Sequence, residues 1–165
     1  SIYRNPIDTP KMELTCRFYA SQFPEVGDVV KANVTEIARG GAFVQLMEYG
    51  KGEGLIPWSE LSRRSIRDVD KVIQVGRPEF AVVLRVDKDK GYIDLSKRRI
   101  NNKERPQYEE RFEKAQAVHD ILRQVAEQLG YGNTDQLKDL HKCTAWKLDE
   151  KVRGSAFDIF QKSIT

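Results

Sequence analysis

The spacing of apolar residues changes once along this chain, and that change limits the folds open to it. Between residues 27 and 99, apolar and polar residues alternate with the period of two that half-buried strands have. Val30, Ala32 and Val34, for example, alternate with polar neighbours. From residue 105 onwards, apolar residues recur every three or four positions, as on one face of a helix. The pattern therefore predicts a β unit followed by an all-helical unit.

The β unit has the strand number and turn spacing of a small barrel. Five short strands fit into about 70 residues and are separated by glycine-containing turns at 39–41 and 87–91. This arrangement is typical of a closed, five-stranded OB-fold barrel. The residues expected to face inward are Ala42, Val44 and Leu46 in the second strand and Ile93 and Leu95 in the last. Those expected to point outward are Phe43, Gln45, Met47, Tyr49, Tyr92, Asp94 and Ser96. In the fourth strand, one face is expected to carry Phe80, Val82, Leu84 and Val86.

The spacing of apolar residues in the second half of the chain predicts several helices. One apolar stripe ends near Gly130, a residue typical of helix ends. The stripe consists of Tyr108, Phe112, Ala115, Val118, Leu122, Val125 and Leu129. A second helix, with Leu137 and Leu140, begins at a cap on Asn133 or Thr134. A third stretch follows Trp146 and carries Val152, Ala156, Phe157, Phe160 and Ile164. The expected organisation is a flexible arm at 1–14, a barrel at 15–100 and a helical domain at 101–165.

The connection between strands three and four, at about 57–78, is unusually long for a compact barrel. It contains the stretch SELSRRSIRD at 59–68, in which serines alternate with arginines. Ser59 is placed to cap a short helix, with Glu60 in its first turn. Three apolar residues further along are expected to anchor the loop to the barrel: Val69, Val72 and Ile73. Loops of this length are often functional.

Composition excludes several classes of protein. The chain has no apolar run long enough to cross a membrane and no leader of the secretory type, so cytoplasmic residence is expected. Its two cysteines and two histidines have no metal-ligand spacing, and His119 and His141 are interpreted as surface or hydrogen-bonded helix residues. No nucleotide-binding loop or nucleophile–base pair is present. The sequence therefore predicts no catalytic residues, no cofactor, no metal and no enzymatic activity.

Nucleic-acid binding is better supported by the residues. The net charge is +3, and basic residues cluster in KRRINNKER at 97–105. OB barrels bind single strands by stacking bases on exposed aromatic rings beside a basic groove. The candidate RNA-binding residues are Phe43, Lys97, Arg98 and Arg99. Two alternatives stay open: the basic cluster is an ordinary solvated surface, or the adjoining loop or helical domain covers Phe43.

Several segments resemble one known family. CRFY (16–19), FPEVGDVV (23–30), EGLIPWSELSRRSIR (53–67), VLRVDKDKGYIDLSKRR (83–99) and TAW (144–146) are similar to the alpha subunit of eukaryotic translation initiation factor 2. The resemblance runs from Met12 to the end of the chain. It implies an RNA-binding OB barrel, a helical domain and a third α/β domain, absent here, that joins the beta and gamma subunits. It also implies that residues 1–11 are an extension or a cloning remnant.

The resemblance implies a function as well. Members of the family deliver initiator methionyl-tRNA, with GTP, to mRNA on the small ribosomal subunit, and the alpha subunit is the regulatory arm. Stress-activated protein kinases phosphorylate the serine that matches Ser62, and the phosphorylated factor inhibits its guanine-nucleotide exchange factor. The implied kinase-docking residues are Lys90, Gly91, Tyr92 and Asp94. The implied loop contacts to partners are Glu60, Arg63, Arg64 and Arg67.

The chain departs from the family pattern around this serine. Pro57-Trp58 replaces two aliphatic residues, Ser65 stands where an arginine is usual, and Asp68 stands where a serine is usual. Ser59 and Ser65 therefore remain competing acceptors. The alternative functions are a general single-stranded RNA-binding OB-fold protein without a phospho-switch and a decoy for the kinase. A decoy needs neither an acceptor nor a helical domain, and this chain has candidates for both.

Overall fold

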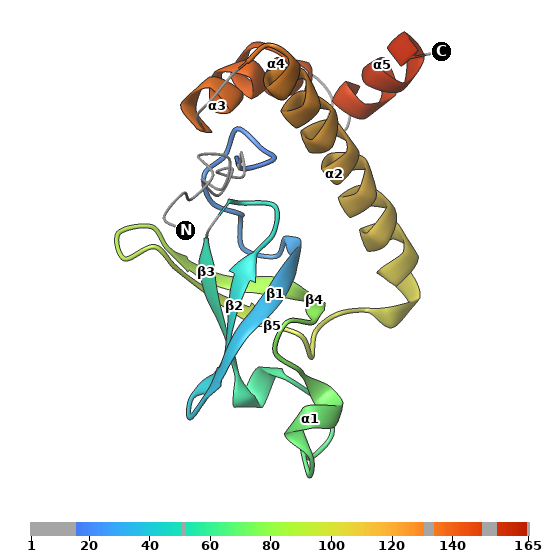
Figure 1. The fold of residues 1–165 in the computed structure, drawn as a ribbon. Helices are drawn as coiled ribbons and strands as arrows, with labels where there is room; N and C mark the ends of the chain where they lie inside the picture. The colour runs from blue at the N-terminus through green and yellow to red at the C-terminus, as the bar shows by residue number, and fades with distance from the viewer. Residues whose placement is uncertain (1–15, 51, 131–133, 150–154, 165) are drawn as a thin grey trace, which may run out of the picture.

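Five strands close into a barrel in a computed structural model that describes residues 16–50, 52–130, 134–149 and 155–164 (Figure 1). The strands are β1 (Val29–Ala38), β2 (Gly41–Leu46), β3 (Glu53–Pro57), β4 (Pro78–Asp87) and β5 (Tyr92–Ser96). Their order around the barrel is β1-β2-β3-β5-β4, with β3 and β5 parallel and the other pairs antiparallel. Helices follow the barrel. This confirms the predicted OB-fold barrel followed by an all-helical part.

The barrel interior is built from small and branched aliphatic side chains that are removed from water. The strand residues of this core are Val30, Ala32, Val34, Ala42, Val44, Leu46, Ile56, Ala81, Val83, Ile93 and Leu95. The inward faces predicted for β2 and β5 are therefore confirmed. Burial of apolar side chains is the main contribution to the stability of such a core.

The prediction that one face of β4 carries Phe80, Val82, Leu84 and Val86 is only partly right: Phe80 and Val82 share a face, but Val86 packs on the barrel core. Ala81 and Val83 point into the barrel, whereas Phe80 and Val82 pack on the opposite side, against the helical part. An irregularity in the pairing of β4 with β5, between Val83 and Arg85, then shifts the alternation by one residue. β4 is apolar on both faces because both faces are covered, so alternation does not identify its inward side.

Tyr49 was also assigned to the wrong side. β2 ends at Leu46, and Tyr49 turns back to pack in the barrel core cluster. Met47 is partly buried against a second cluster at the junction with the helices. The strand period does not apply beyond the last residue of the strand, which explains both positions.

The helical part consists of α2 (Arg105–Gln128), α3 (Thr134–Cys143), α4 (Ala145–Asp149) and α5 (Ser155–Ile164). A single-turn 3-10 helix, η2 (Asn102–Glu104), precedes α2. Gly130, with φ of 72°, lies just after the C-terminal end of α2. The stretch expected after Trp146 forms α5, which contains Ala156, Phe157, Phe160 and Ile164, whereas the short α4 around Trp146 was not predicted. The core of the helical part contains Val118, Leu122, Ala126, Leu137, Ala145, Trp146 and Ala156.

Leu129, which the sequence places on the apolar stripe, is exposed. The proposed arm at 1–14, the Asn133 cap and Val152 lie outside the described residues.

The barrel and α2 meet through aromatic rings and one buried carboxylate. Phe18, Phe80, Ile100 and Phe112 form the buried cluster between them. Beside it, the Glu79 side chain is only 5% exposed and lies within 4 Å of three cationic groups. These groups belong to Lys97 (3.2 Å), Arg77 (3.8 Å) and Arg105 (3.9 Å). Arg105 is the first residue of α2, so the Glu79 carboxylate links the barrel to that helix.

Both histidines are buried, which contradicts the expectation of surface or hydrogen-bonded residues. The rings of His119 and His141 stack with centroids 5.3 Å apart, between Phe18 and Trp146. Neither ring nitrogen of His141 has a hydrogen-bond partner among the described residues. Burial lowers the pKa of His141 to about 3, with further lowering from His119 and Arg17, so its imidazole is neutral at physiological pH.

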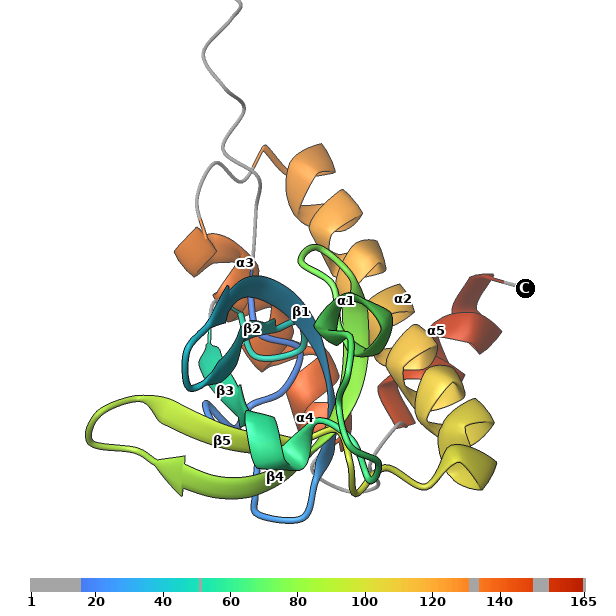
Figure 2. The same cartoon turned by 90° about the horizontal axis from the view of Figure 1, so that it is seen from below.

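The two segments that contain candidate functional residues, the β3–β4 connection and the β4–β5 turn, lie at different places on the barrel. The connection between β3 and β4 lies at the end of the barrel away from α3 and α4 (Figure 1). The β4–β5 turn projects on the side away from α2 (Figure 2). None of the helices in the described residues combines the length and the hydrophobicity that a membrane span requires.

Candidate functional site

The long connection between β3 and β4 has structure of its own. It contains a 3-10 helix, η1 (Trp58–Glu60), and the short α1 (Val69–Val72). Ile73 enters the barrel core, and Val69 and Val72 pack against it, so the three predicted anchors are confirmed. The residues between η1 and α1 therefore form a loop that is anchored at both ends and takes no part in the hydrogen-bonded pairing of the strands.

Two polar residues shape this loop differently from expectation. Ser59 lies inside η1 and caps nothing, because Pro57 occupies the capping position without a side-chain bond. Asp68, one of the departures from the family pattern, caps α1 instead. Its side chain accepts the Asp70 backbone N–H at 3.2 Å.

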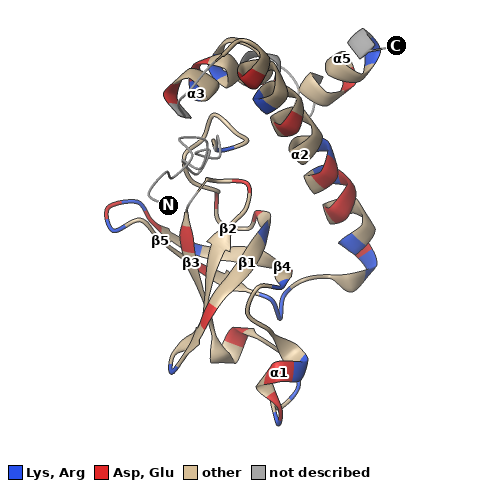
Figure 3. Cartoon of the chain, viewed as in Figure 1, with Lys and Arg blue, Asp and Glu red and all other residues tan. Residues whose placement is uncertain are grey.

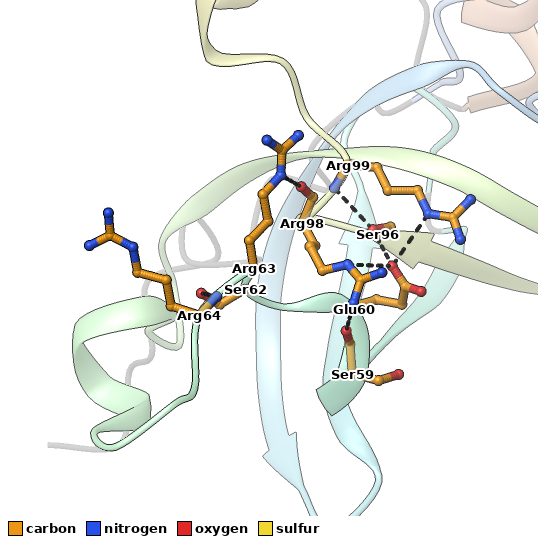
Figure 4. Close-up of polar contacts among 8 residues, drawn as sticks. All are labelled: Ser59, Glu60, Ser62, Arg63, Arg64, Ser96, Arg98 and Arg99. Atoms are coloured by element: carbon orange, nitrogen blue, oxygen red, sulfur yellow. Dashed lines mark hydrogen bonds and ion pairs between the residues drawn. The ribbon is translucent and has the colours of Figure 1, made fainter.

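Ser62 lies partly buried at the start of the loop. Its hydroxyl oxygen accepts the Arg64 backbone N–H at 3.2 Å, a local bond that positions the side chain (Figure 4). The residue lines a hollow of about 390 Å³. Four basic residues line the same hollow: Arg63, Arg64, Lys97 and Arg98. The hydroxyl of Ser62 therefore lies in surroundings that favour a negative charge.

Glu60 connects this loop to the segment after β5. Its carboxylate accepts the Ser96 hydroxyl at 2.6 Å and lies 3.6 Å from Arg99 Nε and 3.9 Å from Arg98 Nε (Figure 4). Backbone contacts reinforce the connection, since the Arg98 N–H donates to the Glu60 carbonyl and Arg63 Nε donates to the Arg98 carbonyl. The loop and the basic segment thus form one hydrogen-bonded unit.

The basic tract that begins at Lys97 is consequently less open than its sequence suggests. Figure 3 shows positive residues along the segment that leads from β5 to α2. The Lys97 side chain is 24% exposed, pairs with Glu79, and donates to the Val72 carbonyl at the end of α1. Arg98 and Arg99 share Glu60 but keep about half of their side chains in solvent. In residues 16–50, 52–130, 134–149 and 155–164, no ion pair involves Arg63, Arg64 or Arg67. An RNA-binding role for this tract stays a prediction.

The residues predicted for kinase docking lie at a free end of the barrel. Tyr92 is 56% exposed at the start of β5, directly after the turn that holds Lys90 and Gly91. The Asp94 carboxylate lies on the same strand face and pairs with Arg85 Nε at 3.4 Å. With more than half of its surface in solvent, Tyr92 is not packed on the helical part. The docking role is not tested by this geometry.

Phe43 is exposed, which removes the alternative that a neighbouring element covers it. Its side chain is 40% exposed on the outer face of β2. The hollow beside it is lined by Thr35, Gln45 and two acidic residues, Glu36 and Glu53. The ring is available for stacking on a base, but the adjacent carboxylates repel phosphates.

Sequence reasoning missed Ser96 and Glu79 as parts of this site. Both are polar residues at the ends of strands, and each contacts groups far away in the sequence. An acidic residue near the start of a strand, such as Glu79 in β4, gives no signal of its own in the sequence, because two of the three cations around it come from other segments of the chain.

A family model and curated proteins resemble the chain. The S1 RNA binding domain matches residues 24–98. The alpha subunit of eukaryotic translation initiation factor 2 from Arabidopsis thaliana is 45% identical over 94% of this chain and 44% of its own length. Subunit 1 of the same factor from Dictyostelium discoideum is 46% identical over 93% of this chain and 45% of its own length. The chain thus spans less than half the length of these relatives.

Solved structures agree with these matches. The intact alpha subunit of aIF2 from Pyrococcus abyssi superposes with a TM-score of 0.75 and 31% identity, over 87% of this chain and 53% of that one. A chain of the a/eIF2alpha-aDim2p-rRNA complex from Pyrococcus horikoshii OT3 superposes with a TM-score of 0.69 and 32% identity, over 86% of this chain and 81% of that one. The chain belongs to the family of the alpha subunit of translation initiation factor 2.

Proposed function

We propose that this chain is the regulatory part of a translation initiation factor 2 alpha subunit and that Ser62 is its phosphorylated residue. The observation that carries the proposal is the position of Ser62, in a loop outside the strand ladders and beside a hollow lined by four basic residues. A loop that is not part of the barrel ladders can move into a kinase active site without unfolding the core. Family membership supports the same assignment, because the SELSRR motif contains this serine.

The geometry favours Ser62 over its two neighbours. Ser59 lies within η1, and its carbonyl accepts Arg98 Nη1 at 3.3 Å. Ser65 is exposed and does not line the basic hollow. A phosphate on Ser62 alone would therefore enter surroundings that already carry several positive charges.

Phosphorylation would reverse the charge of the loop. The basic residues of the loop are Arg63, Arg64, Arg67 and Lys71, and the acidic ones are Glu60, Asp68 and Asp70. A phosphate adds roughly −1.5 to −2 charges, which turns a slightly basic loop acidic. A partner such as the guanine-nucleotide exchange factor can then distinguish the two forms, because a switch acts only through differential binding.

The wider function follows the family. We infer that the complete protein acts in the cytoplasm with the beta and gamma subunits, initiator tRNA, mRNA and the small ribosomal subunit. We further infer that the S1 barrel contributes RNA contacts through Phe43, whose exposed ring is the specific observation in favour. A barrel that bound RNA through Phe43 and had no phospho-switch would be the second candidate function. Salt-dependent binding to unrelated single strands that kinase treatment leaves unchanged would favour it.

Replacing Tyr92 with alanine is expected to slow phosphorylation of an intact Ser62 without changing the fold. The ring is largely in solvent at the start of β5, so its loss creates no cavity. Initial rates with a stress-activated kinase of the type that acts on this family, together with the melting temperature, test this. We expect a rate several-fold lower and a melting temperature within a few degrees of the parent protein.

Leu129→Ala, which replaces an exposed apolar residue at the end of α2, is the control and should leave the phosphorylation rate unchanged. If Tyr92→Ala and Leu129→Ala are phosphorylated at the same rate as the parent, Tyr92 is not a docking residue. A large loss of stability in Tyr92→Ala would assign the residue a packing role.

A further inference from the structure

A second hollow, of about 300 Å³, lies between the N-terminal segment of the described chain and α4. Its walls contain four aromatic residues: Tyr19, Phe23, Tyr49 and Trp146. Three carboxylates line it as well, those of Glu25, Asp28 and Asp149. We propose that this hollow binds the cationic side chain of an arginine or lysine from a partner protein. The proposal goes beyond the function proposed above and does not involve Ser62.

The aromatic walls are held in place by specific contacts. The rings of Tyr19 and Tyr49 lie with centroids 5.4 Å apart and planes inclined by 48°. The Tyr19 hydroxyl donates to Glu48 Oε2 at 2.6 Å, and Trp146 Nε1 donates to the Phe18 carbonyl at 3.0 Å. Rings fixed in this way form a preorganised wall, which lowers the entropic cost of binding a ligand.

The structure itself contains a cation on one of these rings. The Arg17 guanidinium carbon lies 4.6 Å from the centre of the Trp146 ring, within the distance at which a cation is attracted to an aromatic face. Two of the Arg17 nitrogens donate to the Ala20 carbonyl, at 3.0 and 3.3 Å, so this side chain is held against two residues of the lining, Ala20 and Trp146, although Arg17 is not itself part of the lining. The Arg17 contact demonstrates the kind of group that the aromatic wall accepts.

The charged residues that line the hollow favour a positively charged ligand. No lysine or arginine is among the described residues that line the hollow, and none of its three carboxylates takes part in an ion pair with the described chain. One oxygen of Asp28 accepts the Glu25 N–H, and one oxygen of Asp149 accepts the Ala156 N–H, both at 3.0 Å. These two carboxylates are thereby oriented by the backbone, and each retains a second oxygen for a ligand.

These features exclude the other classes of occupant. Phosphate groups of RNA would be repelled by the three carboxylates. A neutral apolar group would cover the carboxylates without giving them partners, which costs free energy. The volume is at the lower end for small-molecule sites, roughly 300–1,000 Å³, and suits one long side chain better than a nucleotide. A guanidinium or ammonium group satisfies the rings and the carboxylates together.

The hollow is remote from the loop that carries Ser62. The segment from residue 16 to β1, drawn in blue, lies at the end of the barrel that faces α3 and α4, whereas α1 lies at the other end (Figure 1). Because Tyr19 and Glu25 precede the barrel and Trp146 and Asp149 belong to α4, a bound side chain would contact both parts of the chain. A partner could therefore hold this face irrespective of the state of Ser62.

The test uses two blocked amino acids of nearly identical shape, N-acetyl-arginine amide and the uncharged N-acetyl-citrulline amide, titrated into the isotopically labelled chain. The indole N–H of Trp146 reports on the hollow by NMR, and that of Trp58, which donates to the Arg39 carbonyl on another part of the barrel, is the internal control. We expect a saturable shift of the Trp146 signal with the arginine compound and little change with the citrulline compound or at Trp58.

Glu25→Gln removes one charge of the lining without disturbing a described side-chain contact. It should weaken binding of the arginine compound about fivefold, the effect of one carboxylate close to a cation in water. Glu36→Gln, which removes an equal charge from the hollow beside Phe43, should have no effect. Equal shifts with arginine and citrulline, no saturable shift at Trp146, or equal effects of the two variants would each overturn the proposal.

Discussion

Replacing Ser62 with alanine should abolish phosphorylation of this chain by a stress-activated kinase. The expected result follows from the surroundings of the hydroxyl, which lies in a loop outside the barrel ladders and beside four basic side chains. The loop anchors, Val69, Val72 and Ile73, remain in place in the variant, so its fold should be unchanged. Incorporation of phosphate, followed by mass-spectrometric mapping of the modified residue, measures the effect.

Two further variants serve as controls for this prediction. Ser59→Ala and Ser65→Ala remove the neighbouring hydroxyls and should keep the full incorporation of the parent chain. Ser62→Asp should imitate the phosphorylated form poorly, because a carboxylate has less charge and fewer acceptor oxygens than a phosphate. Incorporation that survives in Ser62→Ala and disappears in either control would move the acceptor to Ser59 or Ser65.

Replacing Gly41 with alanine should destabilise the barrel by about 3 kcal/mol or more. Gly41 begins β2 with φ of 152°, and a Cβ atom built there would overlap the Ile56 carbonyl and approach Pro57 Cα to 2.9 Å. Both contacts are with the backbone of β3, which pairs with this part of β2 and cannot move aside alone. Urea unfolding, followed by tryptophan fluorescence, measures the loss as a lower midpoint.

Gly40→Ala is the matched control, since it changes the preceding residue of the same turn. A Cβ atom at Gly40 has nothing within 4 Å, so the variant should unfold at nearly the same urea concentration as the parent. Equal midpoints for the two variants would mean that β2 and β3 are not as closely paired at Gly41 as the barrel requires.

The parts of the fold that could be predicted are those where one side of an element faces water. The inward faces of β2 and β5 follow from alternation, because Phe43 and Gln45 separate Ala42, Val44 and Leu46, and Asp94 separates Ile93 from Leu95. Helix α2 and its end at Gly130 follow from the apolar stripe and the glycine. In each case the local pattern and the tertiary contacts agree.

The parts that could not be predicted are those that other elements cover. β4 packs on the barrel core with Ala81 and on the helical part with Phe80, so it has no polar face to mark its orientation. His119 and His141 carry polar atoms into an aromatic cluster, an arrangement that their spacing does not indicate. The short helix α4 was not predicted, because its five residues are too few to show a helical period.

The candidate site was recognised only in part, for a related reason. The length of the connection and its anchors located the loop around Ser62. The contacts of Glu60 with Ser96 and Arg99 join residues more than 30 positions apart, and only the closed barrel brings them together. The basic tract looked open in the sequence because its acidic partners, Glu60 and Glu79, lie in other strands and loops.

The most direct test of the phospho-switch compares the affinity of two forms of this chain for the guanine-nucleotide exchange factor. One form is homogeneously phosphorylated at Ser62, as established by mass spectrometry, and the other is unmodified. We expect the phosphorylated form to bind at least about tenfold more tightly, which requires roughly 1.4 kcal/mol and is within the range of one or two charge-assisted hydrogen bonds. Equal affinity of the two forms would contradict the assignment of Ser62 as the switch.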